Sequence, residues 1–248
     1  MAVRLTVIGS SPAWPNPGGA HAGLLVEGPG RLLLDCGPGV LGRLRERYST
    51  NGWPSVDAIV ITHFHLDPWG DLVPWVWGTM FGLGRDRSRP ELWVPPGGHE
   101  QLRRFGGQLG QDEMFDSCFG VREYAEATPF RAAGLEVTPR RVPHYTLETY
   151  ALRVSDGACS LSYSGDTAPC DPLVETARDV DLFVCEATLE RGDLDGTPRG
   201  HLSAEEAIEA FRRSGARRLL LTHRPSELPV PDGVELAYDG YEVELEGE

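Results

Sequence analysis

The stretch Thr62–Asp71, which reads Thr-His-Phe-His-Leu-Asp-Pro-Trp-Gly-Asp, carries three side chains that can bind a metal ion: His63, His65 and Asp67. The residues before it, 56–61, form a short apolar run rich in β-branched side chains, which predicts a buried strand. Three donors at a rigid strand end are a common way to build a metal site. Histidines two residues apart can also share an exposed strand face without binding anything, so the interpretation depends on the rest of the chain.

Further candidate ligands lie at the ends of other strand-like segments. His144 follows Arg-Val-Pro, Asp166 lies in Ser-Gly-Asp-Thr, and His223 follows the run Leu-Leu-Leu-Thr. Each of them comes after apolar sequence with β propensity. Their presence favours the metal-site interpretation of the first stretch.

Taken in this order, the motifs resemble those of the metallo-β-lactamase superfamily of metal-dependent hydrolases. The resemblance covers nearly the whole chain, and the combination is far more specific than any single motif. Cys-Glu-Ala-Thr at 185–188, followed by Gly-His-Leu-Ser at 200–203, is similar to the branch that holds ribonuclease Z and related phosphodiesterases. The resemblance implies an αββα sandwich of two mixed β-sheets flanked by helices, whereas the residue pattern alone predicts only an α/β chain with much β-structure.

Length and composition predict one large α/β domain over residues 1–248, with two small domains as the alternative, since 40% of the 248 residues are apolar. No run approaches the roughly twenty apolar residues of a membrane span, and residues 2–9 predict a first strand rather than a signal peptide. The five cysteines are scattered without paired spacing, which predicts reduced thiols and a cytoplasmic protein. The formal charge of −14 argues against a long nucleic acid as partner, although a local basic patch could still hold one.

The remaining pattern predicts alternating strands and helices. Helices are expected at 40–48, at 71–81 with Asp71 as N-cap, at 98–107, and at 204–213 behind a capping box of Ser203 and Glu206. Strands are expected at 22–27, 31–35, 91–95, 121–123, 135–142, 150–154, 160–163, 182–185 and 217–222. An acidic hairpin is expected over 234–245.

The resemblance also implies a ligand set. It makes His63, His65 and His144 the imidazole ligands of a first ion, zinc by preference, and Asp166 a bridge to a second ion bound by Asp67 and His223. A pair of divalent ions can share a hydroxide and stabilise charge on a phosphoryl or acyl oxygen.

Pro68 departs from the family motif, which has a histidine at this position. Proline offers no donor atom, so the second ion would keep two carboxylates and one imidazole. We therefore expect a weaker second site, which prefers manganese or iron, and a mononuclear enzyme is the alternative.

Three other histidines need an interpretation. By resemblance, His201 gives a proton to the leaving oxygen, Glu186 holds its imidazole, and both join Asp67 in the catalytic set. The simpler alternative is a histidine beside a helix start. His21 is expected at the surface or facing substrate, with metal binding as the alternative, and His99 is not expected to be a ligand.

These observations predict a metal-dependent hydrolase, specifically a phosphodiesterase that uses a metal-bound hydroxide on a small or cyclic phosphodiester. The alternatives are a ribonuclease Z-like tRNA 3′ endonuclease, a hydrolase of carboxylic esters, lactones or thioesters, and a non-catalytic metal- or ligand-binding protein. No insertion resembles the arm with which ribonuclease Z grips tRNA. The apolar segment 69–81 is a candidate homodimer interface.

Overall fold

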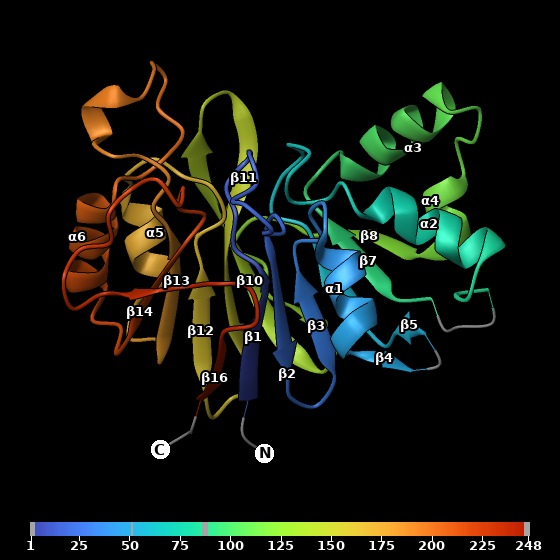
Figure 1. Cartoon of the computed structure of the whole chain (residues 1–248), viewed down its shortest axis with the longest axis horizontal. Helices are drawn as coiled ribbons and strands as arrows, with labels where there is room; N and C mark the ends of the chain where they lie inside the picture. The colour runs from blue at the N-terminus through green and yellow to red at the C-terminus, as the bar shows by residue number, and fades with distance from the viewer. Residues whose placement is uncertain (1–2, 51, 86–88, 246–248) are drawn as a thin grey trace.

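The centre of the molecule is a pair of β-sheets packed face to face, as seen in a computed structural model that describes residues 3–50, 52–85 and 89–245 (Figure 1). Each sheet has seven strands. In spatial order the first sheet comprises β16 (Glu242–Leu245), β1 (Val3–Gly9), β2 (Gly23–Glu27), β3 (Arg31–Leu34), β6 (Ala58–Val60), β7 (Glu91–Val94) and β8 (Gly120–Glu123). The second comprises β15 (Glu235–Leu236), β14 (Leu219–Thr222), β13 (Leu182–Glu186), β12 (Ser160–Tyr163), β11 (Leu147–Ser155), β10 (Leu135–His144) and β9 (Phe130–Ala132).

Both sheets are mixed, with an antiparallel half and a parallel half. In the first sheet, β16, β1, β2 and β3 are antiparallel, while β3, β6, β7 and β8 run parallel. In the second, β9 to β12 are antiparallel and β12 to β15 are parallel. A small separate ribbon pairs β4 (Ser49–Thr50) with β5 (Trp53–Pro54).

Helices cover the outer faces of both sheets (Figure 1). The first sheet carries α1 (Val40–Arg47), α2 (Leu72–Phe81), α3 (Gly98–Gln108) and α4 (Met114–Cys118), and the second carries α5 (Asp171–Thr176) and α6 (Ala204–Ser214). A short 3₁₀ helix, η1 (Gly192–Leu194), lies in the loop before α6. The structure therefore confirms the αββα sandwich. Within the described ranges, no helix is long and apolar enough to cross a membrane.

Strands buried on both faces explain the unbroken apolar runs of the sequence. In β2 and β3, Leu24 and Leu34 enter the core between the sheets, whereas Leu25 and Leu33 enter the core beneath the helices. Successive side chains of a strand point to opposite faces, so two apolar layers require apolar residues at every position. The same reasoning explains why the central strands could be predicted well from sequence.

The predicted hairpin over 234–245 is wrong, because its two arms belong to different sheets. β15 pairs in parallel with β14, and β16 pairs antiparallel with β1. Between them, Ala237 N still donates to Leu221 O of the second sheet, while Gly240 N already donates to Val7 O of the first. The alternation of the sequence shows two strands but not the partner of each.

Asp71 stands at the N-cap position of α2, but its side chain does not cap that helix. Its Oδ2 accepts a hydrogen bond of 2.8 Å from Leu41 N in the first turn of α1, whose own N-cap is Gly39. Because glycine has no side chain to cap with, the carboxylate from a neighbouring segment satisfies that amide. By contrast, the capping box of Ser203 and Glu206 on α6 is confirmed. Residue 2 of the first predicted strand lies outside the described residues.

Candidate metal centre

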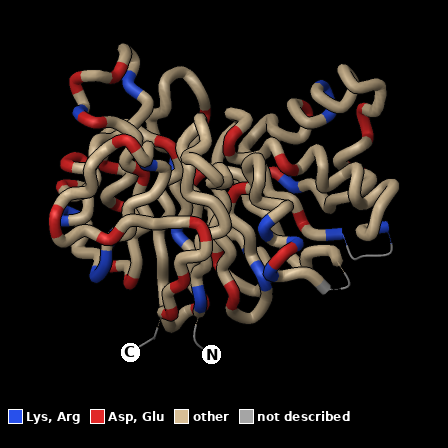
Figure 2. Tube along the Cα trace, in the orientation of Figure 1, with Lys and Arg blue, Asp and Glu red and all other residues tan. Residues whose placement is uncertain are grey.

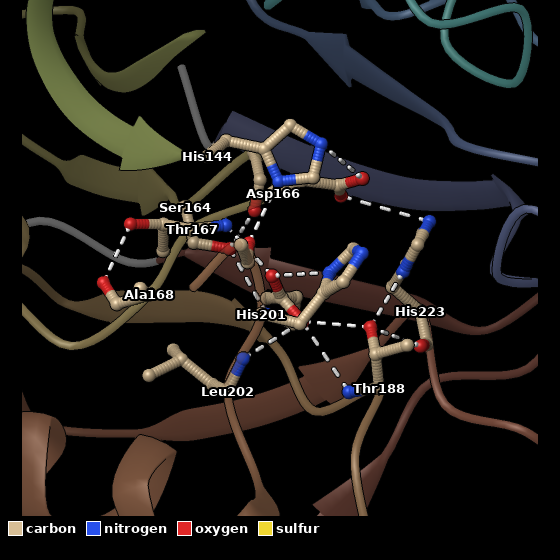
Figure 3. A network of polar contacts seen from close by, with 12 residues as sticks. His144, Ser164, Asp166, Thr167, Ala168, Thr188, His201, Leu202 and His223 are labelled. Carbon is tan, nitrogen blue, oxygen red and sulfur yellow. Dashed lines mark hydrogen bonds and ion pairs between the residues drawn. The ribbon is translucent and has the colours of Figure 1, made fainter. Parts of the chain in front are cut away.

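The predicted site residues meet where several strands end. His63 and Asp67 follow β6, His144 ends β10, Asp166 follows β12, and His223 follows β14. Parallel strands present their carboxyl ends at one edge of a sheet, where ligands of α/β proteins commonly bind. Because the two sheets face each other, the loops from both sheets come together at this edge, and Figure 3 shows part of the resulting polar network.

One cluster, the first donor group, consists of His63, His65, His144 and Asp166, whose ligand atoms all lie within 4.8 Å of one another. His65 Nδ1 and His144 Nε2 are 2.9 Å apart. Asp166 Oδ2 lies 3.6 Å from His63 Nε2 and 3.9 Å from His144 Nε2. Three imidazoles and one carboxylate in this arrangement form a ligand set typical of zinc.

Hydrogen bonds orient two of these imidazoles so that Nε2 faces the group. His144 Nδ1 donates to Gly200 O over 2.7 Å. His63 Nδ1 lies 3.0 Å from the hydroxyl of Thr62, which donates its proton to Asp35 Oδ2, also over 3.0 Å. His63 Nε2 is buried and has no hydrogen-bond partner among the described residues. A buried lone pair beside a carboxylate fits a bound cation, and orienting partners of this kind are usual behind metal ligands.

The electrostatics of the first donor group agree with metal binding. Burial lowers the pKa of His144 to about 4, and it also lowers the pKa values of His63 and His65. These imidazoles are therefore neutral near pH 7, which is the protonation state that binds a metal ion.

A second donor group consists of Asp166, His201 and His223, again within 4.8 Å of one another. His223 Nε2 lies 3.6 Å from Asp166 Oδ1 and 3.2 Å from Asp67 Oδ2. Burial lowers the pKa of His223, but the two carboxylates outweigh it and raise that pKa to about 10. The position therefore favours positive charge, as a second cation would need.

His201 and Glu186 form the predicted pair. His201 Nδ1 lies 3.0 Å from Glu186 Oε1, and the carboxylate is completely buried. Figure 3 shows the ring of His201 beside Asp166 and His223. Burial lowers the pKa of His201, but the neighbouring Glu186 outweighs it, so the pKa is raised above the usual value. The imidazole therefore holds its proton more tightly than an isolated histidine.

The remaining histidines lie outside both donor groups. His99 Nε2 bonds to Asp116 over 2.7 Å at the surface. His21 Nδ1 lies 3.3 Å from Pro38 O, and its Nε2 is buried without a hydrogen-bond partner in the described part of the chain. Pro68 is buried, and its carbonyl accepts from Cys36 N over 2.6 Å.

Sequence reasoning missed three residues behind the site histidines: Thr62 contacts His63, Thr188 contacts His223, and Asp35 contacts Thr62. Asp35 accepts from Thr62 N and from the hydroxyls of Thr62 and Tyr163. Asp35 and His223 also have left-handed backbone conformations, with φ of 61° and 54°. Such conformations are costly for residues other than glycine and gather at functional sites. The sequence offered one signal, which is the position of Asp35 at the end of the strand predicted over 31–35.

Residues 30–224 match the family described as the beta-lactamase superfamily domain. The chain belongs to this superfamily. Ribonuclease Z of Myxococcus xanthus is 30% identical over 308 aligned positions, which cover 98% of each chain. The probable metallo-hydrolase YhfI of Bacillus subtilis is 30% identical over 225 residues, or 90% of this chain and 87% of YhfI.

Solved structures of the superfamily share the fold. The crystal structure of the metallo-β-lactamase fold protein YhfI matches with a TM-score of 0.84 at 25% identity, covering 98% of this chain and 100% of that one. The short form of human tRNase Z matches with a TM-score of 0.75 at 22% identity over 97% of this chain and 98% of that one. The protein is thus a metallo-β-lactamase-fold hydrolase related to ribonuclease Z and YhfI.

Pro68 provides a test of the second metal position within this family. Pro68→His is expected to raise the affinity for a second ion by about tenfold or more, because it adds a neutral imidazole donor next to Asp67. Titration with manganese or zinc would measure the change, with Pro68→Ala as the control that removes the proline without adding a donor. Unchanged affinity would mean that another donor, for which His201 is the best placed, already completes the position.

Proposed function

We propose that the protein is a metal-dependent phosphodiesterase acting on a small or cyclic phosphodiester. The observation that carries the proposal is the Glu186–His201 pair beside Asp166, on the edge of a group of three neutral imidazoles. The first donor group would hold one divalent ion, and Asp67, Asp166 and His223 would hold a second. Divalent ions in such sites lower the pKa of water and neutralise charge on phosphoryl oxygens.

The residues of this chain supply the remaining part of the reaction. Glu186 accepts from His201 Nδ1, which fixes the ring and leaves Nε2 as the nitrogen that can give a proton to the leaving alkoxide. A general acid matters most for phosphodiesters with poor leaving groups, because an alkoxide leaves slowly without a proton. The Glu186–His201 pair therefore supports a phosphodiesterase that acts on alkoxide leaving groups.

The charge distribution favours a small substrate. Figure 2 shows acidic and basic residues interspersed along the trace, and the sequence carries 37 acidic and 23 basic residues. A protein that grips a long polyanion gathers positive charge to neutralise phosphates. The alignment with the Myxococcus ribonuclease Z spans 308 positions, more than the 248 residues of this chain, so parts of that enzyme have no counterpart here.

The relationship to ribonuclease Z supports a second candidate, cleavage of tRNA precursors at the 3′ end, because the alignment covers 98% of each chain.

A panel of substrates separates the candidates. Protein stripped with a chelator and supplied with manganese or zinc would be assayed on bis(p-nitrophenyl) phosphate, p-nitrophenyl butyrate, a cyclic nucleotide and a precursor tRNA.

We expect metal-dependent hydrolysis of bis(p-nitrophenyl) phosphate and of the cyclic nucleotide. Hydrolysis of the carboxylic ester alone would replace the proposal with a carbonyl hydrolase. Cleavage of precursor tRNA without activity on small diesters would support the second candidate. No turnover with any metal would indicate a non-catalytic protein.

A further inference from the structure

Thr188 lies between Glu186 and His223, two residues beyond the end of β13. Its hydroxyl oxygen is 2.7 Å from Glu186 Oε2 and 2.8 Å from His223 Nδ1. A longer contact of 3.2 Å reaches His223 O. All three residues are buried, so water does not replace these bonds readily.

The direction of the Thr188 hydroxyl bond follows from the number of donors around the Glu186 carboxylate. Glu186 Oε1 receives Thr167 N at 2.7 Å and His201 Nδ1 at 3.0 Å, while Oε2 receives the Thr188 hydroxyl and the amides of Thr188 and Leu202. A carboxylate surrounded by donors is an acceptor only. The single hydroxyl proton of Thr188 is therefore given to Glu186, which is its shortest acceptor contact.

The oxygen of Thr188 then accepts a proton from His223. A lone pair of the hydroxyl oxygen faces His223 Nδ1, so Nδ1 carries the hydrogen of this bond. The other ring nitrogen, Nε2, faces Asp67 and Asp166. A ring held at Nδ1 in this way can give up its Nε2 proton and bind a metal ion through that nitrogen, and the partner on Nδ1 sets which nitrogen keeps its proton.

We propose that Thr188 is a positioning residue through which the Glu186 carboxylate orients the metal ligand His223, while the same carboxylate directly orients His201. One buried acid thus supports both the proposed metal ligand His223 and the proposed proton donor His201. The role of His201 rests on the proposed function, whereas the role of Thr188 and His223 concerns metal binding alone. Thr188 is the residue at which the two roles of Glu186 can be separated.

Thr188→Val tests the link, because valine keeps the shape of threonine and removes the hydroxyl. The dissociation constant of the second ion is expected to rise about 10- to 100-fold, the usual effect of removing a group that orients a ligand, with the first ion unaffected. Thr188→Ser retains the hydroxyl and should restore the affinity. The dissociation constants would be measured by isothermal titration calorimetry, in which chelator-stripped protein is titrated with zinc or manganese.

Thr149→Val is the matched control. Thr149 is also fully buried in the second sheet, but its hydroxyl has no hydrogen-bond partner among the residues that the structure describes. Its replacement should leave both metal affinities unchanged. Equal affinities in wild type and Thr188→Val, or a failure of serine to restore binding, would overturn the proposal.

Two further comparisons keep the outcomes distinct. Glu186→Gln should lower the affinity for the second ion and also lower turnover at saturating metal. Thr188→Val should lower only the affinity for the second ion, because the contact between Glu186 and His201 remains in this variant. If no diester is hydrolysed, the proposed function fails while the metal titration still tests the link. If wild type binds one ion only, the readout is the chemical shift of the Nδ1–H proton of His223 in ¹H–¹⁵N spectra, expected downfield as for a hydrogen-bonded proton in wild type and Thr188→Ser and moved upfield in Thr188→Val. An unchanged shift in Thr188→Val would contradict the proposal.

Discussion

Asp166→Ala is expected to remove metal binding and activity together. Asp166 is the residue shared by both donor groups, since Oδ2 faces His63 and His144 while Oδ1 faces His223. Without it, the two positions would lose the carboxylate that joins them, one oxygen facing each position. Metal affinity should fall by more than about 100-fold, beyond the effect of removing a residue that merely orients a ligand.

Asp166→Asn separates charge from shape, and it should also lose both ions, because a neutral amide is a poor substitute for a bridging carboxylate. Asp193→Ala is the control, since Asp193 pairs with Arg191 on an exposed loop and should behave like wild type. Circular dichroism would establish that each variant is folded. Wild-type turnover in Asp166→Ala would refute the site assignment.

His201→Ala is expected to lower kcat about 10²- to 10⁴-fold on diesters with alkoxide leaving groups, which is the usual contribution of a general acid. The loss should be far smaller for bis(p-nitrophenyl) phosphate, because p-nitrophenolate leaves without help from a proton. The first ion should still bind, since His201 is not part of the first donor group. Kinetics on both substrates at saturating metal would measure the difference.

The control for His201 is His99→Ala, which removes an imidazole bound to Asp116 at the surface. This variant should retain wild-type kcat on both substrates. An equal loss for good and poor leaving groups in His201→Ala would contradict proton donation. Together with a missing second ion, it would make His201 a metal ligand.

The local parts of the fold and site could be predicted from the sequence. The β-branched run before His63 predicted β6, and the continuous apolar run before His223 predicted β14. The capping box at Ser203 marked the start of α6 because its two bonds join residues three positions apart. The grouping of the distant residues His63, His65, His144 and Asp166 came from the family resemblance, and the structure brings them together as the first donor group.

Contacts between distant residues that the family motifs do not include could not be predicted. Asp71 caps α1 across 30 positions of sequence, and Thr188 reaches His223 across 35. A hydroxyl or carboxylate can bond many neighbours, and only the packing of the strands selects one. The partner of each C-terminal strand was hidden for the same reason, since alternation shows a buried face without showing which sheet it joins.

Metal stoichiometry of the wild-type protein tests the central claim most directly. Protein saturated with zinc or manganese and then dialysed would be examined by elemental analysis, with Asp166→Ala treated in the same way. We predict at least one tightly retained ion per wild-type chain, a second that is bound more weakly, and none in the variant. Wild-type protein that retains no ion after either metal would contradict the metal centre on which the proposed function depends.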